Sequence, residues 1–128
     1  MRKEADSKEP SAFLPLPTAT LHILLALVDG EKHGYAIMGE VEQMSGGATR
    51  MGPGTLYGSI KRMLGDGLIE ESDNRPDSDL DDQRRRYYRL TGLGERVCEA
   101  EVARLRVLVD RAGSRKLIRR PHPQLGEA

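Results

Sequence analysis

The sequence predicts a small, mainly helical domain that carries one β-hairpin, and three observations support this prediction. Three segments with apolar residues at helical spacing precede two short strand candidates, and a further helical segment follows them. Turn residues separate the helical segments, at Asp29-Gly30, Ser45-Gly46-Gly47 and Asp66-Gly67. The chain has 128 residues, of which 38% are hydrophobic, which is enough for one domain with tails.

Charge is balanced over the whole chain but unevenly distributed along it. The 20 lysine and arginine residues match 20 aspartate and glutamate residues, so the formal net charge is zero. This balance argues against a protein that coats nucleic acid or membrane surfaces through bulk charge. Basic residues nevertheless cluster at positions 84–89 and 111–120, whereas aspartates gather at positions 73–82. A local basic face is therefore compatible with the neutral total.

Cysteine usage and the apolar runs indicate a cytoplasmic protein. Cys98 is the only cysteine, so the chain forms no internal disulfide and a reducing compartment is expected. No apolar run is long enough to cross a bilayer, and residues 1–11 lack the apolar core of a signal peptide. His22, His33, His122 and Cys98 do not occur at a recognised metal-ligand spacing. We therefore expect no metal, no other cofactor and no membrane partner.

The N-terminal part is expected to contain a disordered tail, residues 1–14, and then a helix. Thr18 is a favourable N-cap for this helix, and Asp29-Gly30 is a favourable stop. One apolar face comprises Leu21, Leu24, Leu25 and Val28, and a second comprises Ile23 and Leu27. A helix that is apolar on two sides is usually buried on both. In so small a domain, we expect a second subunit to supply part of the cover.

Two further helices are predicted, from Gly34 to Met44 and from near Pro53 to Asp66-Gly67, with a short extended piece at residues 48–51 between them. The third helix has a core stripe, formed by Leu56, Ile60, Met63 and Leu64. Its other positions include hydrogen-bond donors, on Thr55, Ser59, Lys61 and Arg62, and Gly54 and Gly58 add no bulk. Such a helix can lie in a DNA major groove. The alternative interpretation is an ordinary surface helix with a core face.

Strands are predicted at Leu68–Ser72 and Arg84–Thr91, separated by a long polar turn. Three helices followed by a hairpin is the order of a winged helix-turn-helix domain, here residues 15–91. On the second strand, one face carries Arg84, Arg86, Tyr88 and Leu90, and the other carries Arg85, Tyr87 and Arg89. The arginines near the tip, Arg84, Arg85 and Arg86, could clamp phosphates. A charged, solvated edge strand is the alternative, and the five aspartates of the tip would be repelled by DNA.

The last helix is predicted to follow Thr91, a plausible N-cap, and to run to about Gly113, as a dimerisation helix at residues 92–114 with a tail at 115–128. Apolar residues recur at heptad spacing along it, at Cys98, Val102, Leu105, Val109 and Ala112. Two repeats suffice for a seam between two helices. Packing against its own domain is the alternative. The expected dimer contacts are Leu21, Leu24, Leu25 and Val28 of the first helix with Val102, Leu105 and Val109 of the last.

Four blocks of residues, in their order, resemble the PadR family of bacterial transcriptional regulators. They are His33-Gly34-Tyr35-Ala36-Ile37, Gly52-Pro53-Gly54-Thr55-Leu56-Tyr57, Asp66-Gly67-Leu68-Ile69 and Arg86-Tyr87-Tyr88-Arg89-Leu90-Thr91. Each block alone is a weak motif, whereas the ordered set, over about residues 16–109, is specific. The chain is similar to the short subgroup of the family, whose C-terminal region is one long dimerising helix.

The resemblance implies a homodimer that binds a palindromic operator in double-stranded DNA, as a repressor. In the family, the third helix enters the major groove and the wing reaches the backbone or the adjacent minor groove. Tyr35 would then lie near a phosphate, and the groove-facing contacts would come from Thr55, Tyr57, Ser59, Lys61 and Arg62. Hydroxyl and ammonium groups suit phosphate oxygens. Tyr57 has a second interpretation, as a half-buried aromatic that flanks the core, and His33 is interpreted as a loop histidine or a cap.

Two other function classes compete with DNA binding. A winged-helix domain can instead be a protein–protein interaction module, because fold alone does not assign function. An enzyme is not expected, since no nucleophile–base pair, carboxylate dyad or phosphate loop stands out. The resemblance also implies a small-molecule effector, because family members often respond to small aromatic compounds. With one Phe, four Tyr and no Trp, this chain has little with which to build an aromatic cage.

Overall fold

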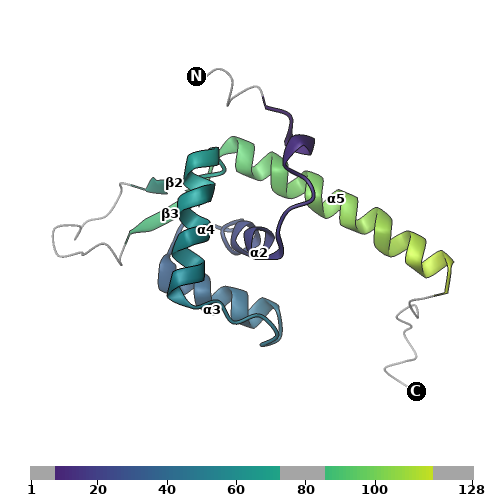
Figure 1. The fold of residues 1–128 in the computed structure, drawn as a ribbon, viewed down its shortest axis with the longest axis horizontal. Coiled ribbons are helices and arrows are strands. Elements are labelled where there is room, and N and C mark those ends of the chain that lie inside the picture. The colour runs from purple at the N-terminus through teal and green to yellow at the C-terminus, as the bar shows by residue number, and fades with distance from the viewer. Residues whose placement is uncertain (1–7, 73–85, 117–128) are drawn as a thin grey trace.

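The computed structural model describes residues 8–72 and 86–116 as helices around a small sheet (Figure 1). The elements in order are η1 (Pro10–Phe13), α2 (Thr18–Ala26), β1 (Lys32–His33), α3 (Gly34–Met44), α4 (Pro53–Asp66), β2 (Ile69–Ser72), β3 (Tyr87–Leu90) and α5 (Gly92–Ser114). This order confirms the predicted fold class, mainly helical with a small antiparallel hairpin. The predicted bounds of α3 and α4 agree with the structure.

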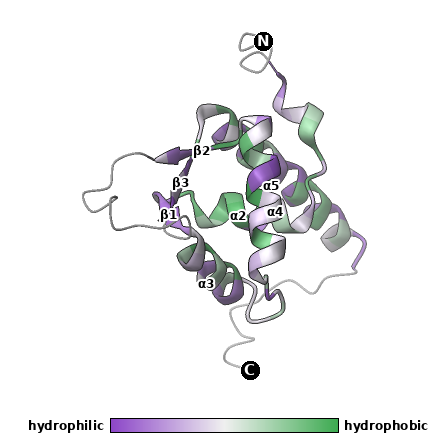
Figure 2. Ribbon diagram, turned by 60° about the vertical axis from the view of Figure 1, so that its left-hand side comes forward, coloured by the Kyte–Doolittle hydropathy of each residue, from purple (hydrophilic) through white to green (hydrophobic). Residues whose placement is uncertain are grey.

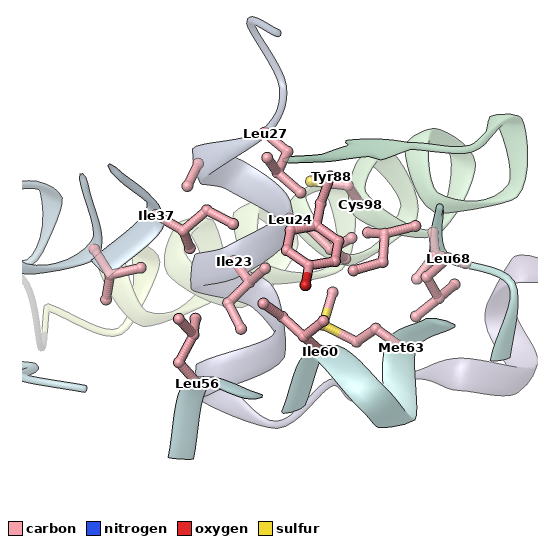
Figure 3. Packing of buried hydrophobic residues seen from close by; sticks show 14 of the residues in the cluster. Ile23, Leu24, Leu27, Ile37, Leu56, Ile60, Met63, Leu68, Tyr88 and Cys98 are labelled. Atoms are coloured by element: carbon pink, nitrogen blue, oxygen red, sulfur yellow. The ribbon is translucent and has the colours of Figure 1, made fainter. Parts of the chain in front are cut away.

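The core forms around α2, which is hydrophobic along its length (Figure 2). Ile23, Leu24 and Leu27 of α2 are buried and meet side chains from every other main helix and from the sheet (Figure 3). These partners are Ile37 of α3, Leu56, Ile60 and Met63 of α4, Leu68, Tyr88 of β3, and Val97 and Cys98 of α5. Because α2 contacts α3, α4 and α5, it links the long C-terminal helix to the other two helices.

The three strands form one antiparallel sheet in the order β1-β3-β2. Register pairs Glu70 with Arg89, and an ion pair of 2.9 Å joins the glutamate carboxylate to the arginine Nε across the strands. Tyr88 of β3 points into the core, as the alternation predicted. The two-residue strand β1 was not predicted. Lys32 pairs with Tyr88 on the far side of β3, so β3 is the central strand and not an edge.

Local hydrogen bonds fix where the helices begin and end. The backbone N–H of Gly94 donates to the Thr91 hydroxyl at 3.0 Å, which confirms Thr91 as the N-cap of α5. The Thr91 hydroxyl in turn donates to the carbonyl of Gly67. Gly67 ends α4 in the left-handed region, with φ of 79°, where a side chain would be strained. One threonine and one glycine therefore tie the end of α4 to the start of α5.

The N-terminal part of the chain differs from the prediction in two respects. Thr18 is the first residue of α2 and Pro17 is its N-cap, with no side-chain cap bond. Residues 10–13, expected within a disordered tail, form the 3-10 helix η1, which packs against α5. Apolar side chains explain the difference, because Phe13, Leu14 and Leu16 pack against the core. At residues 48–51 the structure has a loop and no strand.

Helix α5 continues past the rest of the domain (Figure 1). Its first half is anchored by Leu93, Val97 and Cys98 in the core, whereas most residues from 106 to 111 are exposed. Within the described ranges, no helix is both long enough and apolar enough to span a membrane. The distal half of α5 therefore presents an apolar and basic surface that the other described residues leave exposed.

Candidate nucleic-acid interface

The outer face of α4 is exposed, basic and nearly free of bulk. Apart from Pro53 at the start of the helix, its exposed residues share one side and are Gly54, Thr55, Gly58, Lys61, Arg62 and Gly65. A Cβ built on any of the three glycines would meet no atom within 4 Å. The opposite side of α4 is fixed in the core by Leu56, Ile60 and Met63. A flat partner can therefore approach the α4 backbone closely, while packing in the core fixes the opposite side of the helix.

Ser59 does not belong to this outer face. Its exposed fraction is 4%, so its hydroxyl is not at the surface where the expected DNA contact would lie. The physical reason is its register, since Ser59 is three residues after Leu56 and four before Met63. That spacing places Ser59 on the core stripe of the helix, so its burial could have been predicted from the sequence.

Tyr57 lies between α4 and the start of α3. Its ring packs against the core and its hydroxyl is buried. A Cβ on Gly34, the first residue of α3, would overlap the Tyr57 hydroxyl and Cζ, so the ring tip rests on the α3 backbone. The structure thus agrees with the second interpretation of this residue, a half-buried aromatic that flanks the core. Its buried hydroxyl is not at the surface where the expected groove contact would lie.

Tyr35 lies at the start of α3 with half of its surface exposed (50%). His33 orients this corner of the domain. Its Nδ1 accepts a hydrogen bond of 3.2 Å from the backbone N–H of Ala36, which makes His33 the N-cap of α3. The His33 ring also contacts Tyr35 and Tyr87 edge-on, with centroids 6.4 and 5.3 Å apart. The interpretation of His33 as a cap is confirmed, and Tyr35 is placed beside the sheet.

The sheet presents one of the three predicted wing arginines. Arg86 is exposed and its Nη1 lies 2.9 Å from Oε2 of Glu71 on the neighbouring strand. An exposed ion pair of this kind contributes about 0–1 kcal/mol, so a phosphate could displace Glu71 at little cost. Arg84 and Arg85 lie outside the described residues, as do the aspartates of the tip.

An apolar groove of about 520 Å³ lies between the end of α2, strand β3 and the first half of α5. Its lining comprises Leu25, Val28, Leu90, Glu95, Cys98, Glu99, Val102, Ala103 and Arg106. Burial raises the pKa of the Cys98 thiol, with a smaller contribution from the charge of Glu99. The thiol therefore stays protonated and acts as a small apolar side chain.

The predicted dimer residues separate into three groups. Leu24 is fully buried in the core of the chain (0%), so it offers no surface for the predicted dimer contact. Leu21, Leu25 and Leu105 are half-buried. Val28, Val102 and Val109 are exposed. Leu25, Val28 and Val102 lie together in the apolar groove, whereas Val109 lies one heptad further along α5. Cys98, at the start of the heptad pattern, faces the core.

Comparison with known families identifies the chain. The family described as Transcriptional regulator PadR-like matches residues 23–100, which include the end of α2, all of α3 and α4, the sheet and the start of α5. The chain belongs to the PadR-like family. This confirms the resemblance inferred from the four sequence blocks, and membership in a family of transcription regulators agrees with the expectation that the chain is not an enzyme.

Two curated proteins are similar in sequence. One is an uncharacterized 37.1 kDa protein in transposon Tn4556 of Streptomyces fradiae, 37% identical over 83 residues, or 65% of this chain and 21% of that protein. The other is the transcriptional regulator Rv3488 of Mycobacterium tuberculosis, 38% identical over 74 residues, or 58% of this chain and 63% of that protein. The matches thus span about a fifth of one relative and less than two thirds of the other.

Solved structures share the fold. A PadR family transcription regulator from hypervirulent Clostridium difficile R20291 superposes with a TM-score of 0.61 at 23% identity, covering 77% of this chain and 97% of that one. Bacillus subtilis PadR in complex with operator DNA superposes with a TM-score of 0.57 at 20% identity, covering 67% of this chain and 47% of that one. These neighbours confirm the winged-helix architecture.

Proposed function

We propose that this chain is a DNA-binding transcriptional regulator, a repressor that acts as a homodimer on a palindromic operator. The observation that carries the proposal is the outer face of α4, where Thr55, Lys61 and Arg62 alternate with glycines on a helix anchored in the core. The solved structure of Bacillus subtilis PadR, which shares this fold, is that of a complex with operator DNA. A protein bound at a promoter can exclude other proteins from that DNA, so repression is the proposed direction of regulation.

The side chains of this face divide into two roles. Lys61 and Arg62 carry charges that neutralise phosphates, which positions the protein on the duplex without reading its sequence. Thr55 lies in the first turn of α4, where a short hydroxyl can reach base edges in the major groove. The hydroxyl of Tyr35, a half-exposed residue at the start of α3, suits a second phosphate, and Arg84, Arg85 and Arg86 suit the DNA backbone beside the wing.

The rival function, a protein-interaction module, is less compatible with this surface. A protein-binding face is expected to centre on exposed aromatic or aliphatic anchors. Apart from Pro53 at its start, the exposed residues of α4 are glycine, threonine, lysine and arginine. The apolar surface of the domain lies elsewhere, in the groove between α2 and α5 and on the distal half of α5.

A second copy of the chain is the proposed occupant of that groove. Val102 and Val109 are exposed at heptad positions of α5, so two α5 helices can share an apolar seam. Charge favours an antiparallel pair, because Glu95 and Glu99 lie beside the groove in the first half of α5, whereas Arg111 and Arg115 lie in or beyond its last turn. A small-molecule effector that bound at this seam would release the operator by changing the separation of the two α4 helices.

Selection from a random pool of duplexes with the wild-type protein tests DNA binding. We expect a palindrome to be enriched, and Lys61→Ala and Arg62→Ala to weaken binding to all duplexes alike. If each side chain contacts one phosphate, the salt dependence of log K should fall by about one unit per contact and protomer. Thermal stability should change by less than about 0.5 kcal/mol, because both residues are exposed and off the core stripe.

The matched control is Arg96→Ala, which removes an exposed arginine from α5. It should leave both the affinity and the salt slope unchanged. A pool from which the wild-type protein enriches no duplex would contradict DNA binding. Wild-type affinity in both α4 variants would contradict the assignment of α4 as the groove element.

A further inference from the structure

Glu101, halfway along α5, is a buried carboxylate that the proposed DNA and dimer contacts do not use. Its exposed fraction is 2%. A carboxylate removed from water needs strong partners, since burial of an unpaired charge is costly. Hydrogen bonds from Arg104 and from the Leu16 backbone lower the pKa of Glu101 despite its burial. The side chain is therefore ionised and fully engaged near neutral pH.

The partners of Glu101 come from two separate parts of the chain. Arg104, one turn along α5, approaches both carboxylate oxygens, with Nε 2.6 Å from Oε1 and Nη2 3.0 Å from Oε2. The backbone N–H of Leu16 donates to Oε2 at 3.1 Å across a separation of 85 residues. A paired guanidinium fixes the orientation of a carboxylate. Arg104 therefore orients the Glu101 carboxylate so that its Oε2 accepts the hydrogen bond from the Leu16 N–H.

The segment that Glu101 holds, residues 9–17, passes across the middle of α5 (Figure 1). Its 3-10 helix η1 packs against α5, and Phe13, Leu14 and Leu16 pack against the core. Pro17 then leads directly into α2. The hydrogen bond from Leu16 to Glu101 thus attaches the chain just before α2 to the middle of α5.

This hydrogen bond affects how α4 and α5, the helices proposed to bind DNA and the second subunit, are placed relative to each other. Helix α2 packs against both α4 and α5, so its direction sets the angle between the outer face of α4 and the seam on α5. We propose that Glu101 is a positioning residue that fixes this angle and so sets the half-site separation that the dimer accepts. The inference rests on the proposed function, a dimer on a palindrome.

Stability alone does not account for a buried carboxylate at this position. An apolar residue of similar volume often stabilises a protein as well as a buried ion pair does, or better. Apolar burial, however, is non-directional, whereas three directed hydrogen bonds favour one orientation. The distinguishing property of Glu101 is therefore control of geometry, which a spacing assay measures directly.

The test uses the duplex selected by the wild-type protein and the same duplex with one base pair inserted between its half-sites. The insertion rotates one half-site by about 34° relative to the other. We expect Glu101→Met, which removes every bond to the carboxylate, to lower the wild-type penalty for the insertion by about tenfold, equivalent to a loss of about 1.4 kcal/mol. Glu101→Gln keeps an acceptor for the Leu16 N–H and should lower it less. Asp110→Asn, on an exposed part of α5, is the matched control and should leave it unchanged.

The ratio of the two affinities separates positioning from a purely structural role. A loss of folded protein lowers binding to both duplexes equally and leaves the ratio unchanged. A folded Glu101→Met variant with the wild-type ratio would overturn the inference and leave the proposed function intact. If Glu101→Met does not fold, Arg104→Gln at the partly exposed partner serves instead, and an unchanged ratio there would also overturn it. Failure of the wild-type protein to select any duplex would instead overturn the proposed function.

Discussion

Gly94, in the first turn of α5, lies where a side chain has no room. A Cβ at this position would overlap the backbone carbonyl of Leu68, and a backbone atom cannot move aside as a side chain does. Gly94→Ala should therefore push α5 away from the start of β2 and destabilise the domain by about 1–3 kcal/mol. Thermal or urea unfolding monitored by circular dichroism measures the change.

The control is Gly113→Ala, in the last turn of the same helix, where a Cβ would meet no atom within 4 Å. Alanine is favoured over glycine within helices by up to about 1 kcal/mol, so this variant should be as stable as the wild type or slightly more so. Equal stability of the two variants would show that the close approach of Gly94 to Leu68 is unimportant.

Single residues also show what the sequence could and could not predict. The burial of Ser59 was accessible from its spacing to Leu56 and Met63, but its hydroxyl favoured a polar interpretation. The role of Glu101 was not accessible, because its partner Leu16 is 85 residues away and donates through the backbone. A glutamate in a charged helix looks the same in sequence whether it is buried or exposed.

At the scale of elements, the glycines of α4 are expected to allow a close approach to DNA at a cost in helix stability, and one substitution tests both effects. Gly58 is exposed within the helix, and a Cβ there would meet no atom within 4 Å. Gly58→Ala should stabilise the fold by about 0.5–1 kcal/mol because alanine is the better helix former. If the α4 backbone approaches DNA closely, the added methyl group should weaken binding to the selected duplex.

The measurement pairs unfolding with DNA affinity for Gly58→Ala and for Gly39→Ala. Gly39 is an exposed glycine of α3, and a Cβ there also has open space. Gly39→Ala should give the gain in stability without the loss in affinity. If Gly58→Ala bound DNA as tightly as the wild type, the glycines of α4 would not serve a close approach.

The elements that could be predicted are those set by neighbours in sequence. The bounds of α3 and α4 agree with the prediction because local features, the Pro53 start and the Gly67 end among them, determine them. The strand β1 was missed, since two residues become a strand only by pairing with β3, more than 50 residues later. The helix η1 was missed for the same reason, because packing on α5 orders a segment that looks polar in sequence.

At the scale of the whole molecule, α5 has opposite faces that predict different consequences for the same substitution. Val109 and Val107 are exposed to similar extents, 55% and 48%, within one protomer. The two side chains are two residues apart and so point to nearly opposite sides of the helix. Only Val109 continues the heptad positions of Val102 and Leu105, along which a second copy is proposed to lie.

Val109→Asp should therefore convert a dimer into a monomer, whereas Val107→Asp should leave the dimer intact. A carboxylate in the seam would be buried against apolar side chains, and the apolar surface lost from the interface costs about 25 cal/mol per Å². Both valines are exposed in the protomer, so neither variant should unfold it. Sedimentation velocity at micromolar concentration distinguishes the two states.

The oligomeric state also predicts how DNA binding changes. Two α4 helices presented by a dimer reach half-sites about one helical turn, ~34 Å, apart, so a monomeric Val109→Asp protein should bind a palindrome no better than an isolated half-site. Val107→Asp should retain the preference of the wild-type dimer. A wild-type protein that sediments as a monomer, or equal effects of the two substitutions, would rule out the heptad face of α5 as the seam. If the two substitutions differ as expected, the effect of Val109 on DNA binding acts through the joined pair of domains, since the residue lies on the distal half of α5 and outside the outer face of α4.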